Sequence, residues 1–96
     1  QFPSHSLGDD VLYLKAKIAE SMGDFERAKD LYNTLIGAYP NDILVDNAYY
    51  FLAQIYQYKL NMPEKAKEAY QNLIEKHTNS IFIVDSRNQF RKLRGF

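Results

Sequence analysis

One pattern of residues occurs twice in the chain, in GDFERAKDLYNTLIGAYPND (residues 23–42) and in NMPEKAKEAYQNLIEKHTNS (residues 61–80). Their alignment pairs Tyr32 with Tyr70. Upstream of these segments Ala16 pairs with Ala53, and their separation is one residue smaller than that between Tyr32 and Tyr70. The second copy therefore has one extra residue, which we place in the turn YKLNMP. An internal repeat with a fixed period between roughly 20 and 50 residues predicts a solenoid of stacked units.

Small and apolar residues recur in each copy at spacings of three and four, which is the period of one helical face. In the first helix of each copy they are Leu12, Ala16 and Ala19, and then Tyr49, Ala53 and Tyr56. In the second helix they are Ala28, Tyr32, Leu35 and Ile36, and then Ala66, Tyr70, Leu73 and Ile74. We therefore predict helices over residues 9–21, 24–37, 44–59, 63–76 and 81–94.

Local signals indicate where the second helix of each copy begins and ends. Asp24 is a suitable N-cap, and Pro63 suits a first helical turn, where its missing N–H has no partner. Gly37 and Pro40 are expected to end the first of these helices. A partial third copy indicates four parts: residues 1–8 as the tail of a preceding repeat, repeats at 9–42 and 43–80, and a C-terminal capping helix at 81–96.

The composition excludes several classes of protein. Hydrophobic residues make up 46% of the 96 residues, enough for a packed core. Twelve basic residues balance twelve acidic ones, so no overall field favours nucleic acid. The absence of cysteine excludes disulfides and thiolate metal sites, and no apolar run is long enough to insert into a membrane. Because the chain lacks an initiator Met, we expect it to be part of a longer protein.

The repeat resembles the tetratricopeptide repeat (TPR) family, in which a large, a small and a large residue are followed by Ala, an aromatic, a bulky apolar residue and Pro. These positions read Leu12, Ala16, Ala19, Ala28, Tyr32, Leu35 and Pro40, and then Tyr49, Ala53, Tyr56, Ala66, Tyr70, Leu73 and Thr78. Ala19, Lys15 and Thr78 depart from the pattern. The resemblance implies an all-α, right-handed solenoid of about five antiparallel helices that binds a peptide or helix of a protein partner in its concave groove.

The repeat is longer than the standard period of about 34 residues. Most of the excess lies in the connection YPNDILVDN. In this respect the chain is similar to the repeats of bacterial envelope proteins, namely outer-membrane assembly lipoproteins of the BamD type and the Tol-Pal-associated coordinator. This similarity favours the periplasm or envelope, with the cytoplasm as the alternative.

The helix position just after the first core residue faces the concave groove in the family, and here it is occupied by Tyr13 and Tyr50. Continuing along that face, we predict a peptide groove formed by Tyr13, Lys17, Glu20, Tyr50, Gln54, Gln57, Asn88 and Lys92. The tyrosines offer apolar area and a hydroxyl at low entropic cost. A merely solvated face is the alternative reading. The Lys and Asn pair of the family's carboxylate clamp is missing.

Two other surfaces are singled out by the sequence. The last helix carries Arg87, Arg91 and Arg94, a basic patch that either keeps a capping helix soluble or binds an acidic partner or phosphate. The first helix lacks the helix that would precede it in the solenoid, so weak homo-oligomerisation through this N-terminal face is expected.

Nothing in the sequence indicates an enzyme. His5, in the expected leading loop, and His77 belong to no metal-binding or catalytic motif, and no glycine-rich phosphate loop is present, so no cofactor is expected. Glu26 with Lys29 and Glu64 with Lys67 have the spacing of surface ion pairs. The alternative function is a structural spacer in a chain whose enzymatic or membrane-anchoring domain lies upstream.

Overall fold

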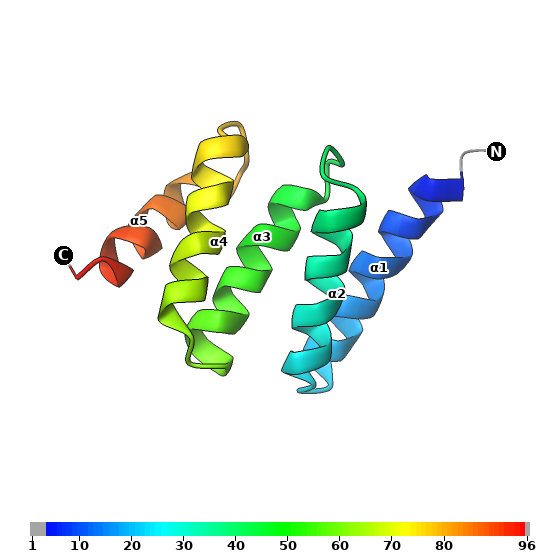
Figure 1. Ribbon diagram of the computed structural model, residues 1–96, viewed down its shortest axis with the longest axis horizontal. Helices are drawn as coiled ribbons and strands as arrows, with labels where there is room; N and C mark the ends of the chain where they lie inside the picture. The colour runs from blue at the N-terminus through cyan, green and yellow to red at the C-terminus, as the bar shows by residue number, and fades with distance from the viewer. Residues whose placement is uncertain (1–3, 96) are drawn as a thin grey trace.

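A computed structural model of the protein describes residues 4–95, with side chains from residue 8 onward. Its helices are α1 (Ser4–Ser21), α2 (Phe25–Ala38), α3 (Val45–Gln54), α4 (Pro63–Lys76) and α5 (Ile83–Leu93), and α3 continues into a π-helical turn, η1 (Ile55–Lys59). The helices stand in one row in chain order (Figure 1), within a slab of 48 × 30 × 18 Å. No strand occurs among the described residues, and the predicted all-α helical solenoid is confirmed.

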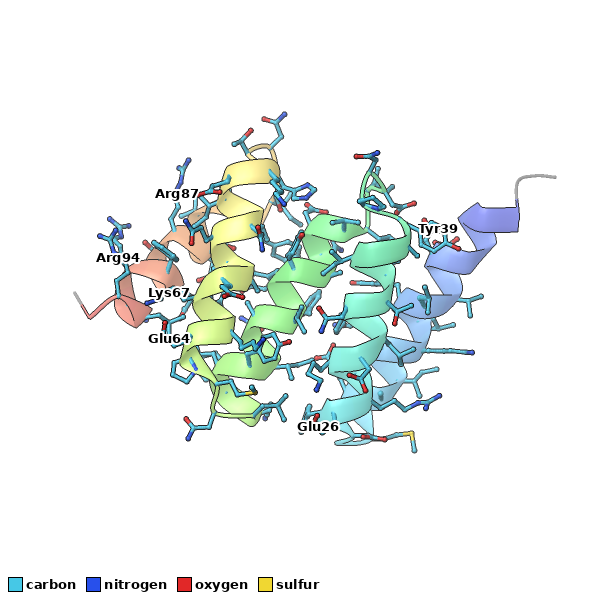
Figure 2. All side chains as sticks on the ribbon, in the orientation of Figure 1. Glu26, Tyr39, Glu64, Lys67, Arg87 and Arg94 are labelled. Atoms are coloured by element: carbon cyan, nitrogen blue, oxygen red, sulfur yellow. The ribbon has the colours of Figure 1, made fainter. Side chains whose placement is uncertain are left out.

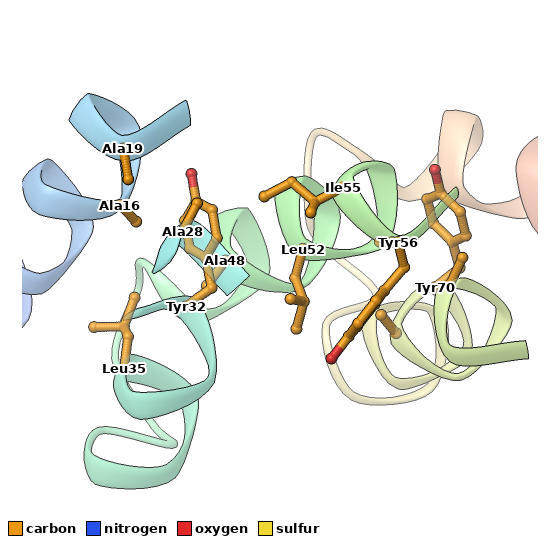
Figure 3. Packing of buried hydrophobic residues seen from close by; sticks show 13 residues of the cluster. Ala16, Ala19, Ala28, Tyr32, Leu35, Ala48, Leu52, Ile55, Tyr56 and Tyr70 are labelled. Carbon is orange, nitrogen blue, oxygen red and sulfur yellow. The ribbon is translucent and has the colours of Figure 1, made fainter. Parts of the chain in front are cut away.

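The core lies where each helix packs on the next, and the repeat positions fill it. Ala16, Ala28, Ala53 and Ala66 have no exposed surface, which lets the paired helices approach closely. Tyr32 and Tyr70 are also fully buried, and Figure 3 shows Tyr32 and Tyr70 at equivalent places in the two units. The surface pair between Glu26 and Lys29 (2.8 Å) forms as expected, as does the pair between Glu64 and Lys67 (3.1 Å), whose residues Figure 2 labels.

The turn between α1 and α2 depends on a glycine in a left-handed conformation. Gly23 has φ +79°, its N–H donates to the Glu20 carbonyl (3.0 Å), and the Asp24 N–H donates to the Ala19 carbonyl (2.9 Å). These bonds satisfy carbonyls that the end of α1 would otherwise leave unpaired. The predicted N-cap is confirmed, because the Asp24 carboxylate accepts a hydrogen bond from the Arg27 N–H at 3.3 Å.

The extra residue of the second copy lies in a helix, and our placement of it in the turn was wrong. The Leu60 N–H donates to the Ile55 carbonyl at 2.9 Å, a bond to the fifth residue back that defines η1. The Met62 N–H then reaches the Tyr56 carbonyl (2.7 Å), one residue further than the matching bond in the first copy. A π turn therefore absorbs the insertion, while Asn61, at φ +54°, takes the place of Gly23. Pro63 opens α4 as predicted.

Several helix boundaries differ from the prediction, by one residue except at the starts of α1 and α5. α1 begins at Ser4, so residues 4–8 of the expected tail, including His5, belong to a helix, while residues 1–3 lie outside the described part of the chain. α2 continues through Gly37 to Ala38, because Tyr39 provides the cap by donating its N–H to the Leu35 carbonyl (2.9 Å). α5 begins at Ile83 because Ser80 forms a turn before it, its hydroxyl accepting the Phe82 N–H at 3.0 Å.

The two glycines at the ends of α1 and α2 should respond oppositely to alanine. A Cβ at Gly23 or Gly37 would meet no atom within 4 Å, so only backbone conformation differs between the two sites. Gly23→Ala should lower the free energy of unfolding by roughly 1 kcal/mol, because φ is +79° there. Gly37→Ala should raise it by up to ~1 kcal/mol, because alanine favours a helix. Urea denaturation midpoints measure both, and a loss at both sites would contradict the helical assignment of Gly37.

Candidate functional site

One side of the solenoid receives the hydroxyl groups of the two buried repeat tyrosines. Tyr32 donates its hydroxyl hydrogen bond to the Glu20 carboxylate, and Tyr70 donates to the Gln57 side-chain carbonyl at 2.8 Å. In Figure 3 these two hydroxyls point to the same side, and that of Tyr56 points to the opposite one. Burial raises the pKa of both Tyr32 and Tyr70. The core therefore holds two of the predicted groove residues in place.

Tyr13 and Tyr50 lie on this same side but are half-buried, whereas we expected them to be exposed. Tyr13 packs edge-on against Tyr32, with ring centroids 6.2 Å apart, and its hydroxyl accepts a hydrogen bond from Asn47 (3.4 Å). The ring of Tyr13 thus packs on the second helix of its own unit, and its hydroxyl contacts α3 of the next unit. Both tyrosines are therefore less exposed than we predicted, and their role in a peptide groove stays a prediction.

Tyr50 is held by residues that come before and within α5. Its ring stacks on Phe82 with centroids 4.3 Å apart, and its hydroxyl donates to the Asp85 carboxylate at 2.5 Å. The same hydroxyl accepts a hydrogen bond from the Gln54 amide (2.9 Å). Burial and the Asp85 hydrogen bond raise the pKa of Tyr50 to about 12. Tyr50 therefore joins α3 to the last helix.

Sequence reasoning missed two phenylalanines of this surface. Phe51 makes edge contacts with Tyr50 (5.5 Å between centroids) and Phe82 (5.7 Å), and both phenylalanines are half-buried. The Lys17 ammonium lies 3.3 Å from the centroid of the Phe51 ring, a cation–π contact. Phe82 could have been found, because it repeats the apolar Leu44 at the same offset that pairs the two buried tyrosines. We name the set Tyr13, Lys17, Tyr50, Phe51 and Phe82 the A-face cluster.

The remaining predicted groove residues surround the cluster less closely. The side-chain amide of Gln57 in η1 donates a hydrogen bond to the side-chain carbonyl of Gln89 in α5 at 3.1 Å. This bond links η1 to the last helix. Asn88 and Lys92 are exposed on α5, and no hydrogen bond between described residues joins them to the cluster. The Asn88 side-chain carbonyl accepts instead from the Arg91 guanidinium (2.8 Å).

The predicted basic residues line a groove between the last two helices. Figure 2 shows Arg87 of α5 and Arg94, the C-cap of that helix, at the end of the row opposite α1. Together with α4 they border a cavity of about 320 Å³, which we name the α4–α5 groove. Its lining residues are Gln71, Ile74, Glu75, Arg87, Phe90, Arg91 and Arg94.

Comparison with protein families identifies the repeat. A family model described as "Tetratricopeptide repeat" matches residues 10–42 and 47–80. The chain belongs to the tetratricopeptide repeat family. TPR units generally mediate interactions between proteins. A search of curated proteins and a search of solved structures found no match.

The family match bears on the repeat and not on the envelope subgroup, which stays a prediction from the long connection. In the described part of the TPR chain, no helix combines the length and apolar character that crossing a membrane requires. Among the same residues, no three His, Asp or Glu side chains are grouped so that they could hold a metal ion.

The N-terminal side of the TPR array exposes an apolar stripe on α1. Val11, Leu14, Ile18 and Met22 are 47%, 60%, 48% and 77% exposed. Val11, Leu14 and Ile18 lie on one face of α1, away from the buried Ala16, and Met22 follows just beyond the end of the helix at Ser21. This is the face through which we predicted weak homo-oligomerisation, and self-association remains a prediction.

Two carboxylates meet where α1 approaches the connection between α2 and α3. Asp9 is 5% exposed, and a hydrogen bond with the Asp42 carboxylate, followed by burial, raises the pKa of Asp9. The Asp42 carboxylate also accepts the Leu44 N–H at 2.8 Å and so shapes the connection. Because the pKa is raised, the folded protein binds the Asp9 proton more tightly than the unfolded chain does.

Asp9→Asn should therefore stabilise the protein at neutral pH. Above its raised pKa Asp9 is ionised, and the neighbouring Asp42 disfavours that charge, whereas below the usual value of 3.8 Asp9 is protonated in the folded and the unfolded chain. The advantage of the variant should thus be full at neutral pH and shrink as the pH falls through this interval. Urea midpoints across pH measure it, with the exposed Glu68→Gln as control. A variant less stable than wild type at neutral pH would contradict this effect of Asp42.

Proposed function

We propose that this TPR protein is a non-enzymatic scaffold that holds a peptide or helix of a protein partner on the A-face cluster. The observation that carries the proposal is the continuity of the rings. Tyr13 of α1 contacts Tyr32 at 6.2 Å between centroids, Tyr32 contacts Phe51 of α3 at 6.4 Å, and Phe51 contacts Phe82 before α5 at 5.7 Å. Tyr32 is fully buried and links these rings from beneath, so a partner that crosses the row of helices would meet the half-buried rings of Tyr13, Phe51 and Phe82.

The cluster combines apolar area with one cation, the Lys17 ammonium. Half-buried rings present faces and edges to a partner and lose little entropy on binding, because core contacts already fix them. Within the described residues, Lys17 forms an ion pair with the Glu20 carboxylate at 3.5 Å. The side chain of Lys17 is 36% exposed. Its ammonium could therefore turn from the Phe51 ring towards an acceptor on a bound peptide. The expected ligand has an apolar side chain next to a carbonyl or carboxylate oxygen.

A rigid spacer is the second candidate function, and a specific observation favours it. Many polar groups on this side are bonded to one another, such as the hydroxyl of Tyr50 to Asp85 and the amide of Gln57 to Gln89. Such bonds lock successive units together and leave fewer groups for a ligand. A spacer predicts that the surface binds no peptide while its loss loosens the array.

A peptide selected from a random library against the wild-type chain provides the test. Tyr13→Ala and Lys17→Ala should each weaken binding of that peptide by about 1 kcal/mol, or roughly fivefold, because they remove aromatic area and a charged donor. Lys15→Ala, exposed on the same helix and outside the cluster, is the matched control. Calorimetric titration measures affinity, and circular dichroism confirms that each variant is folded.

Two outcomes would contradict the scaffold proposal. Unchanged affinity of both cluster variants would place the peptide on another surface. Failure to select any peptide, together with reduced unfolding cooperativity in Tyr50→Phe, would favour the spacer, since that substitution removes the bond between Tyr50 and Asp85.

A further inference from the structure

We propose that the α4–α5 groove is a second docking surface, and that it takes an acidic amphipathic helix from a partner protein. The bound helix would lie where the second helix of a further repeat unit packs in a TPR array. This surface is separate from the A-face cluster and does not depend on the function proposed for that cluster.

Alignment of the repeats indicates that the α4–α5 groove corresponds to the place where a helix packs in the preceding unit. Position by position, α5 repeats α3 at the offset that pairs Tyr32 with Tyr70. Arg87, Phe90 and Arg94 therefore stand where α3 and η1 have Tyr49, Leu52 and Tyr56. Those three residues surround one cavity together with Lys65, Glu68, Ala69 and Asn72 of α4. In the second unit, this face of α3 and η1 packs against α4. The same face of α5 lines the α4–α5 groove.

The residues that α4 contributes to the groove also correspond to residues of α2 in the preceding unit. Gln71 and Ile74 of α4 line the groove and repeat Asn33 and Ile36 of α2 in the same register. Asn33 borders the cavity next to α4 and donates its amide hydrogen bond to the Tyr56 hydroxyl at 3.3 Å. A helix in the α4–α5 groove would therefore contact two helices, as α4 does.

One difference in the register determines which helix fits. Ala53 is fully buried where α3 packs on α4, whereas the same position in α5 is the exposed Arg91. An arginine at this point prevents the close approach that the alanine allows, and it presents a guanidinium to the incoming helix. At this position the small residue that accommodates the next helix of a repeat is therefore replaced by an arginine that can bind a carboxylate.

Charge and apolar area in the groove define the partner. Phe90 and Ile74 are half-buried and supply the apolar floor, and arginines line it from α5. Arg87 and Arg91 form no ion pair with a carboxylate of the described residues. The one acid of the lining, Glu75, accepts a hydrogen bond from Gln71 at 2.9 Å. A helix with apolar residues at spacings of three and four, flanked by Glu or Asp, complements this surface.

A charge-swap experiment tests the proposal with two synthetic probes. Both are helix-stabilised peptides with one leucine stripe, flanked by glutamates in the first and by lysines in the second. The wild-type chain should bind the glutamate peptide about tenfold tighter than the lysine peptide at low salt, and R87E/R91E should reverse the order. Calorimetric titration gives the affinities. Both arginines are exposed, so the variant should keep its thermal midpoint.

Further measurements separate this surface from the alternatives. Lys17→Ala should leave the affinity of the glutamate peptide unchanged, which distinguishes the groove from the A-face cluster. Equal binding of both peptides to the wild type, or no reversal in R87E/R91E, would overturn the proposal. Binding of anionic phosphatidylglycerol vesicles without binding of the glutamate peptide would also overturn it, and would assign the arginines to a lipid surface.

Discussion

Close packing of paired helices at alanine is the constraint on which the rest of the structure depends. Ala16 and Ala28 in the first unit, and Ala53 and Ala66 in the second, are all fully buried. Because no side chain beyond Cβ separates the helices there, a tyrosine from the second helix can pass through the core and reach the far side. Tyr32 and Tyr70 do so, and each hydroxyl finds a partner on the preceding helix or turn. The core and the A-face cluster are therefore parts of one packing arrangement.

The chain presents two surfaces with different chemistry. The A-face cluster is built from rings that α1, α3 and the residue before α5 bring together, with Lys17 as its cation. The α4–α5 groove has arginines around an apolar floor. They form for different reasons: the first follows from the repeated tyrosines of the core, and the second from residues of α5 that break the repeat, above all Arg91 in the place of Ala53. A scaffold with both could hold two different partners.

The register of the repeat was sufficient to predict the core, because positions such as Leu35 and Leu73 recur at a fixed separation and are both fully buried. The π turn was not predictable, since a helix and a loop can absorb one inserted residue equally well in sequence. The partners of Tyr50 were missed because Phe82 and Asp85 lie far from it along the chain, beyond the whole of α4. Grouping of Arg87, Arg91 and Arg94 was predicted, but the groove that they line needs Ile74 and Gln71 of another helix.

The most direct test of the alanine constraint compares the unfolding free energy of Ala53→Leu with that of Lys59→Leu. Both substitutions introduce leucine into the second unit. Ala53 is fully buried, whereas Lys59 is exposed. Ala53→Leu should lower the unfolding free energy by ~1 to 3 kcal/mol, because the helices cannot separate without loss of core contacts, while Lys59→Leu should change it by less than about 0.5 kcal/mol. Equal effects of the two substitutions would contradict the alanine constraint.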